Sequence, residues 1–128
     1  MSSLYNELVM DHFRNPRNIG EMENPDGTGH AESSADSDIM ELYIKVTDDR
    51  ISEAKFRTFG CAAAIAASSM TTVMVKEKTI EEALKITNLA VTEALGGLPP
   101  IKIHCSVLAE QAIQSAIEDY YKNRGEVL

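Results

Sequence analysis

The chain has 128 residues, enough for one domain that buries a core without disulfides or an obligatory metal. The hydrophobic fraction of 44% and the charged fraction of 25% are typical of a soluble globular protein, and no apolar run approaches the roughly 18 residues of a membrane span. The net charge of −8 argues against nucleic acid as the main partner, because phosphate binding needs a basic surface. We expect a single domain over residues 1–128. We also expect a cytoplasmic location, because the acidic N-terminus lacks the basic region of a secretory signal.

The first expected element is a helix that ends before Pro16. Leu4, Leu8 and Val9 recur at helical spacing, and the residue before a proline is disfavoured in the helical conformation. A loop rich in Gly, Pro, Asn and Asp follows, from residue 15 to about residue 29. The acidic residues are concentrated in the second half of this loop and in the segment after it: residues 21–53 contain ten acidic and two basic residues. A solvated acidic loop explains this concentration, and an environment that favours a cation is the functional alternative.

Two strands are expected next, because residues 40–47 and 54–58 both alternate between apolar and polar side chains. The polar turn at residues 48–50 joins them into an antiparallel hairpin. A shorter strand between Thr28 and Ser34 is expected at the edge of this hairpin.

The second half of the chain is expected to be helical. Residues 62–75 contain neither glycine nor proline, and Thr79 with Glu82 has the form of a capping box. The expected helices span residues 62–75, 80–86, 89–95 and 106–123, with residues 98–102 extended because a helix interior does not accept two prolines. Strands followed by helices indicate an α+β fold, with helices packed on one face of a three-stranded antiparallel sheet.

Both cysteines are expected at helix N-termini, since Cys61 follows Gly60 at a strand-to-helix switch and Cys105 precedes the last helix. Free N–H groups and the positive end of the helix dipole would lower the pKa of each thiol and make it a nucleophile or a metal ligand. Inert buried thiols are the alternative. A structural disulfide is disfavoured in a reducing cytoplasm.

Two further kinds of residue extend this candidate site. His104 adjoins Cys105 and is a candidate ligand or proton shuttle. Asp36 and Asp38 precede the first long strand, and their side chains would point the same way if the segment were extended. A solvated turn is the alternative for this pair. Carboxylates together with thiolates and an imidazole suit zinc or iron.

Three segments resemble the iron–sulfur scaffold family called IscU, the counterpart of the NifU N-terminal domain. The family's opening is matched by residues 5–20, YNELVMDHFRNPRNIG. Its strand–Gly-Cys–helix segment is matched by residues 55–69, KFRTFGCAAAIAASS, and its chaperone-binding motif running into His-Cys-Ser by residues 98–110, LPPIKIHCSVLAE. The resemblance covers nearly the whole chain and implies an IscU/SufE-like fold.

The resemblance also implies a ligand set, with one departure. Asp36 stands where the family has its first cysteine, and Ser37 stands where the family has glycine. In the family, three cysteines with an aspartate or histidine hold a 2Fe–2S cluster, and a second set can hold zinc or a single iron. That second set is complete here as Asp38, Cys61, His104 and Cys105. Asp36 would add an oxygen ligand, since iron accepts carboxylate, and would change the redox potential or transfer of a cluster.

By resemblance, the chain is a scaffold rather than an enzyme. Iron would bind first, and a cysteine desulfurase would deliver persulfide sulfur to Cys105, which is expected to be an exposed thiol of low pKa. Reduction would yield sulfide, and the 2Fe–2S cluster would pass to acceptor apo-proteins. A chaperone of the Hsp70 type would bind Leu98, Pro99, Pro100, Ile101 and Lys102. Tyr5 matches a position that relatives use in a dimer contact, so the chain is expected to be a monomer or a weak homodimer.

Two other functions remain open. A zinc-bound sulfur acceptor would activate a desulfurase without building clusters, although zinc-type relatives carry an insertion between their second and third cysteines that this chain lacks. A degenerate scaffold, disabled by Asp36, would act as an interaction protein. A hydrolase fits poorly, because four protein ligands on zinc leave no position for water.

Overall fold

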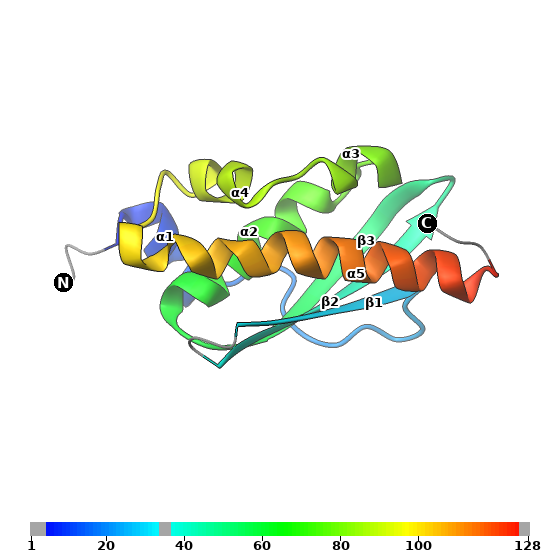
Figure 1. The fold of residues 1–128 in the computed structure, drawn as a ribbon, viewed down its shortest axis with the longest axis horizontal. Helices are drawn as coiled ribbons and strands as arrows, with labels where there is room; N and C mark the ends of the chain where they lie inside the picture. The colour runs from blue at the N-terminus through cyan, green and yellow to red at the C-terminus, as the bar shows by residue number, and fades with distance from the viewer. Residues whose placement is uncertain (1–4, 34–36, 126–128) are drawn as a thin grey trace.

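The structure is a computed structural model that describes residues 5–33 and 37–125, apart from the side chains of Ile101 and His104. Helices and strands follow one another in the expected order, and Figure 1 shows the long last helix lying along the strands. The elements are α1 (Glu7–Arg14), β1 (Gly27–Ser33), β2 (Asp38–Thr47), β3 (Arg50–Phe59), α2 (Ala62–Val75), α3 (Ile80–Leu84), α4 (Asn88–Ala94), the 3₁₀ helix η1 (Pro100–Ser106) and α5 (Val107–Asn123).

The three strands form one antiparallel sheet in the order β1-β2-β3, which confirms the predicted α+β fold. Along β2 every second side chain is buried, and these inward residues include Met40, Leu42 and Ile44. Helix α5 packs on β1 and β2, and α2 packs on β3. The buried side of the sheet and α5 therefore share one hydrophobic core, as the period-two pattern requires.

Strand β1 and helix α5 lie in unusually close contact. A Cβ atom on Gly29 would overlap the backbone oxygen of Ala112, so this position accepts only glycine without movement of the helix. Two backbone N–H groups of β1 also donate hydrogen bonds to side chains of α5. Thr28 N donates to Asp119 Oδ2 at 2.8 Å and His30 N donates to Ser115 Oγ at 3.1 Å, both on α5.

One expected local structure is wrong. The segment around the two prolines is extended only as far as Pro99, because the 3₁₀ helix η1 begins at Pro100. Lys102 N donates to Pro99 O at 2.8 Å, which is the i→i+3 bond of a 3₁₀ turn. A proline is tolerated in the first turn of a helix, where its missing N–H would have no partner. Within the described residues, no helix is both long and apolar enough to cross a membrane.

Helix α1 is joined to α2 by a buried polar contact. His12, which is 4% exposed, shares a hydrogen bond of 2.8 Å between its Nδ1 and Ser69 Oγ, and the same hydroxyl accepts from Arg17 N at 2.9 Å. Burial lowers the pKa of His12 from its ordinary value, and the nearby charge of Arg17 adds to this effect. The neutral imidazole is therefore the form that suits the folded state.

We expect the free energy of unfolding to decrease as the pH falls below about 6.5, the ordinary pKa of histidine. The unfolded chain then binds a proton that the folded chain does not bind until its lower pKa is reached, so acid favours unfolding. Urea unfolding at pH 7.5 and pH 5.5 measures this. His12→Asn, which keeps a hydrogen-bonding atom near Ser69 but does not titrate, should show a smaller pH dependence. An equal dependence in both proteins would contradict the prediction.

Candidate metal centre

Cys61 is placed by the switch from β3 to α2. It is the N-cap residue of α2, with extended backbone angles (φ −73°, ψ 172°), and its carbonyl accepts the N–H of Ile65 at 3.1 Å. The predicted position at a helix N-terminus is confirmed. The thiol is half-buried, and no side-chain capping bond occupies it.

Asp38 is the first residue of β2 and pairs with Ser33 of β1. Its position in the alternation is the inward one, so the carboxylate points to the side of the sheet that carries the helices. Only 3% of the residue is exposed. Buried carboxylates are uncommon unless they are paired or bind a metal, so its neighbours are informative.

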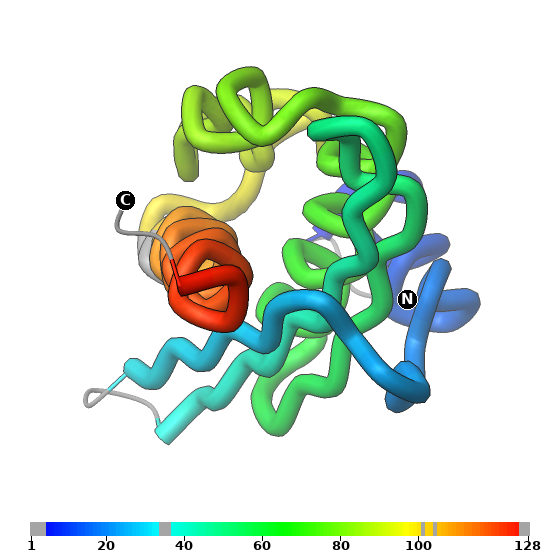
Figure 2. The backbone as a smooth tube through the Cα atoms, turned by 90° about the vertical axis from the view of Figure 1, so that its right-hand side faces the viewer, coloured from blue at the N-terminus to red at the C-terminus, as the bar shows by residue number. Residues whose placement is uncertain are grey.

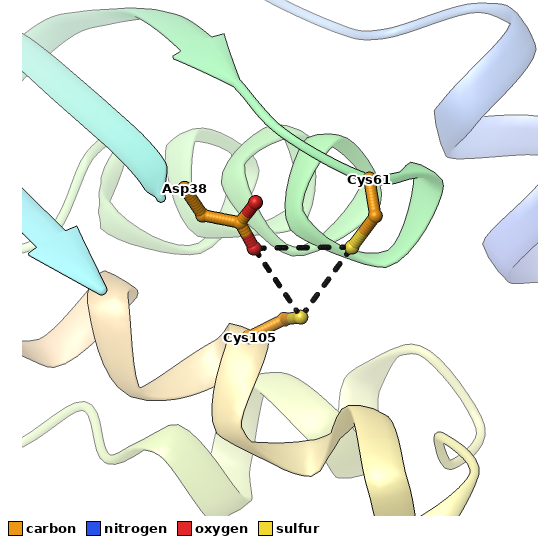
Figure 3. Close-up of side chains that lie close together, drawn as sticks. All are labelled: Asp38, Cys61 and Cys105. Carbon is orange, nitrogen blue, oxygen red and sulfur yellow. Dashed lines mark hydrogen bonds between the residues drawn. The ribbon is translucent and has the colours of Figure 1, made fainter. Parts of the chain in front are cut away.

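Cys105 lies in η1, one residue before that helix ends, and is 1% exposed. Its sulfur meets the other two side chains, as Figure 3 shows. Asp38 Oδ2 is 3.9 Å from Cys61 Sγ and 3.7 Å from Cys105 Sγ, and the two sulfurs are 3.5 Å apart. Three separate segments, at the starts of β2 and α2 and the end of η1, thus bring three metal-ligand atoms within 4.8 Å of one another.

These distances fit a tetrahedral metal. Two thiolate sulfurs bound to one zinc lie about 3.8 Å apart, and a bound sulfur and oxygen lie about 3.5 Å apart. The observed sides of 3.5, 3.7 and 3.9 Å differ from these values by only a few tenths of an ångström. The three ligand atoms therefore lie close to the positions that one face of a tetrahedral metal site requires.

The expected lowering of the Cys105 pKa is wrong for this metal-free arrangement. Burial raises the pKa of the Cys105 thiol well above its usual range, and the neighbouring Cys61 and Asp38 raise it further. Cys105 lies inside the 3₁₀ helix that runs into α5, not at an open helix end, and its packing against Ala63 and Ala64 leaves it 1% exposed to water. The assumption that Cys105 is an exposed sulfur is wrong for the same reason.

Two of the predicted ligands are not tested. Asp36 lies outside the described residues, and the side chain of His104 is not described, although its backbone belongs to η1. The structure therefore brings together Asp38, Cys61 and Cys105 of the predicted set.

Two residues predicted to contact partners lie beside the thiols. Tyr5 and Leu98 are partly buried and pack, with Cys61, against the small cluster of Ala63, Ala64 and Cys105. Burial raises the pKa of the Tyr5 phenol, and the negative charge that Cys61 and Cys105 can carry acts in the same direction. Tyr5 therefore borders the candidate metal centre in this arrangement of the chain.

Two backbone features of the site were not recognised from the sequence. Ser37, directly before Asp38, has φ +58°, a conformation that glycine accepts more readily than serine. Gly60, directly before Cys61, lies against the Asp38 side chain. The glycine that the family has at position 37 was a usable signal for the first feature, whereas the second depends on a contact between β2 and the end of β3.

Ser37→Gly is expected to stabilise the folded protein by about 0.5–1 kcal/mol, because it removes most of the cost of a left-handed conformation while adding some chain entropy to the unfolded state. Thermal or urea unfolding measures the gain. Ser37→Ala is the matched control: it removes the hydroxyl but keeps the Cβ atom, so it should bring no gain. Equal stabilisation by both variants would show that the backbone conformation is not the cause.

Comparison with known proteins agrees with this arrangement. The family model described as NifU-like N terminal domain matches residues 4–127. The chain belongs to the NifU-like N-terminal domain family. A relative from Archaeoglobus fulgidus, named iron-sulfur cluster assembly scaffold protein IscU 1, is 57% identical over 124 residues. The alignment covers 97% of this chain and 81% of the relative. The IscU scaffold protein of Escherichia coli is 50% identical over 124 residues, and the alignment covers 94% of this chain and 96% of the relative.

Solved structures show the same family fold. The crystal structure of a putative iron-sulfur cluster assembly scaffold protein for the SUF system from Fervidobacterium islandicum superposes with a TM-score of 0.75 at 23% identity, covering 89% of this chain and 96% of that chain. A NifU-like N-terminal protein from Brucella abortus gives a TM-score of 0.74 at 19% identity, covering 93% and 95%. The predicted IscU-type fold and family membership are confirmed.

Proposed function

We propose that this chain is a scaffold on which a 2Fe–2S cluster is assembled from iron and sulfur and then passed to acceptor apo-proteins. The observation that carries the proposal is the triangle of Asp38, Cys61 and Cys105, whose sides match those of a tetrahedral metal site. Relatives at 50–57% identity are named as iron-sulfur cluster assembly scaffolds, which supports the same role here.

Iron, as the substrate of assembly, would first meet Asp38, Cys61 and Cys105, with His104 as the fourth ligand. Mixed thiolate, imidazole and carboxylate sites suit iron as well as zinc, so zinc could occupy the same position. Asp36 would contribute an oxygen ligand to the finished cluster in the place where the family has a cysteine. We expect this oxygen ligand to weaken the hold on the cluster relative to a thiolate.

Sulfur would arrive as persulfide from a cysteine desulfurase, with Cys105 as the proposed acceptor. Two electrons per sulfur, from the ferrous iron and from an external electron donor, would reduce it to the sulfide of the cluster. Since Cys105 is 1% exposed, transfer requires either movement of η1 or initial capture by the more exposed Cys61, 3.5 Å away. Mass spectrometry after reaction with a desulfurase and cysteine distinguishes these routes. Persulfide on Cys105 in Cys61→Ala supports direct delivery, and its absence there but presence in wild type supports passage through Cys61.

Other partners follow from the same proposal. An Hsp70-type chaperone would bind residues 98–102, of which Pro100 is exposed and Leu98 and Lys102 are partly buried. Tyr5 would leave its position beside the thiols to make a contact in a weak homodimer. We propose the cytoplasm as the site of these reactions.

The test of the scaffold function is anaerobic reconstitution with ferrous iron, a cysteine desulfurase, cysteine and dithiothreitol as reductant, followed by visible absorbance and Mössbauer spectroscopy. Wild type should give the spectrum of a 2Fe–2S cluster. Asp36→Ala should lose it, and Asp36→Cys should form a more stable cluster. A colourless protein that retains zinc and still stimulates the desulfurase would instead support a zinc-bound sulfur acceptor. A protein that binds no metal and leaves both thiols free would indicate a degenerate scaffold.

A further inference from the structure

The backbone of Gly60 lies in contact with the Asp38 side chain, on the side of the carboxylate that carries Oδ1. A Cβ atom built on Gly60 would be 2.5 Å from Asp38 Oδ1 and 2.8 Å from Asp38 Cγ, closer than real Cβ atoms approach other heavy atoms. The backbone of Gly60 is not in the left-handed region, so its conformation does not itself demand glycine. Glycine is therefore favoured at this position because a side chain would occupy space that the Asp38 carboxylate fills.

That space is filled by the carboxylate that faces the two thiols. Asp38 directs Oδ2 to the sulfurs of Cys61 and Cys105, at 3.9 and 3.7 Å, while Oδ1 of the same group lies against Gly60. Because Asp38 is only 3% exposed, it has little room to turn away from a new neighbour.

From this packing we infer that Gly60 is a positioning residue for the metal centre: its lack of a side chain allows Asp38 to hold its carboxylate at the distance that a metal shared with Cys61 and Cys105 requires. The inference rests on the proposed function, since it assumes that these three residues bind a metal.

The size of the expected displacement supports this role. A 2.5 Å contact must lengthen by at least 0.5 Å to reach 3.0 Å, the lower limit that real Cβ contacts respect. Metal–ligand distances tolerate deviations of only about 0.2 Å, and functional groups lose their productive geometry at about 0.5 Å. A single methyl group at position 60 is therefore large enough to disturb the site.

The test is titration of Gly60→Ala with cobalt(II), whose visible bands report the number and geometry of its thiolate ligands. We expect an affinity about 10–100-fold weaker than in wild type, as for other changes to residues that orient metal ligands, and altered cobalt bands. Ile117→Val is the control for general destabilisation, because it removes one buried methylene from the core beneath the sheet. It should lower the melting temperature without changing the cobalt spectrum.

A second pair of variants identifies Asp38 as the group displaced. In the Asp38→Ala background the two contacts below 3.0 Å are gone and only the 3.2 Å approach to Ala64 Cβ remains. Adding Gly60→Ala should therefore lower the melting temperature and the residual metal affinity much less than it does in wild type. If Gly60→Ala fails to fold alone but folds in this background, the steric role is supported. If it fails in both backgrounds, or if Gly60→Ala binds cobalt as wild type does, the inference is wrong.

These outcomes separate the inference from the proposed function. If the wild-type protein binds no cobalt, or if Asp38→Ala and Cys61→Ala bind cobalt as tightly as wild type does, the proposed metal centre is wrong. The role of Gly60 is then wrong as well. Wild-type binding that depends on Asp38 and Cys61 but not on the size of residue 60 would overturn only the role of Gly60.

Discussion

Saturating zinc raises the melting temperature of the wild-type protein by about 10 °C if the triangle of Asp38, Cys61 and Cys105 binds metal as proposed. A ligand that binds only the folded state at 100 times its Kd adds about 2.7 kcal/mol, and a chain of this size gains roughly 3–5 °C for each kcal/mol. Metal binding also displaces the proton that burial holds on Cys105, so the gain should increase with pH. Differential scanning fluorimetry at two pH values measures both effects.

Cys61→Ala is the control for this expectation, because it removes the more exposed of the two sulfurs and leaves the buried one in place. It should lose most of the zinc effect while keeping a similar melting temperature without metal. Magnesium, which prefers oxygen ligands, should leave the wild-type melting temperature unchanged. An unchanged melting temperature with zinc would contradict the prediction.

Oxidation of the metal-free protein with diamide is expected to join Cys61 and Cys105 in an intramolecular disulfide and to abolish zinc binding. The sulfurs, now 3.5 Å apart, need to approach by about 1.5 Å to reach the S–S bond length. The disulfide leaves neither sulfur available as a thiolate ligand, so dithiothreitol should restore binding. Intact mass spectrometry under non-reducing conditions detects the loss of two hydrogen atoms.

Zinc added before the oxidant should protect both thiols, which distinguishes oxidation at the metal centre from general damage. Cys61→Ser should give no intramolecular product. Formation of disulfide-linked dimers in place of the internal bond would mean that the sulfurs do not approach each other as the structure indicates. Because Cys105 is buried, such dimers would have to form through Cys61.

The parts of the fold that could be predicted are those in which local pattern and long-range packing agree. Helix α2 occupies the predicted residues 62–75, because a run without glycine or proline is bounded by Gly60 at one end. The capping box of Thr79 and Glu82 is present with both of its hydrogen bonds. The alternation in β2 identified which residues face the core, since period two leaves only one register.

The features that could not be predicted depend on contacts distant in sequence. Burial of Cys105 comes from packing against Ala63 and Ala64 of α2, and from Tyr5 at the other end of the chain. No local pattern around residue 105 contains that information, so the expected low pKa was wrong. The contact of Gly60 with Asp38 was likewise hidden, because it depends on how β2 and the end of β3 lie side by side.

The polar bonds between β1 and α5 affect the behaviour of the protein when it carries no metal. An open strand edge is a template on which other chains can add strands, the first step of aggregation. Here Asp119 and Ser115 of α5 already accept the outward N–H groups of Thr28 and His30. Figure 2 views the molecule from one end, with α5 beside the strands. A scaffold that passes its cluster on, as proposed, would spend intervals without it, and we expect these two hydrogen bonds to disfavour the addition of further copies at this edge of the sheet during those intervals.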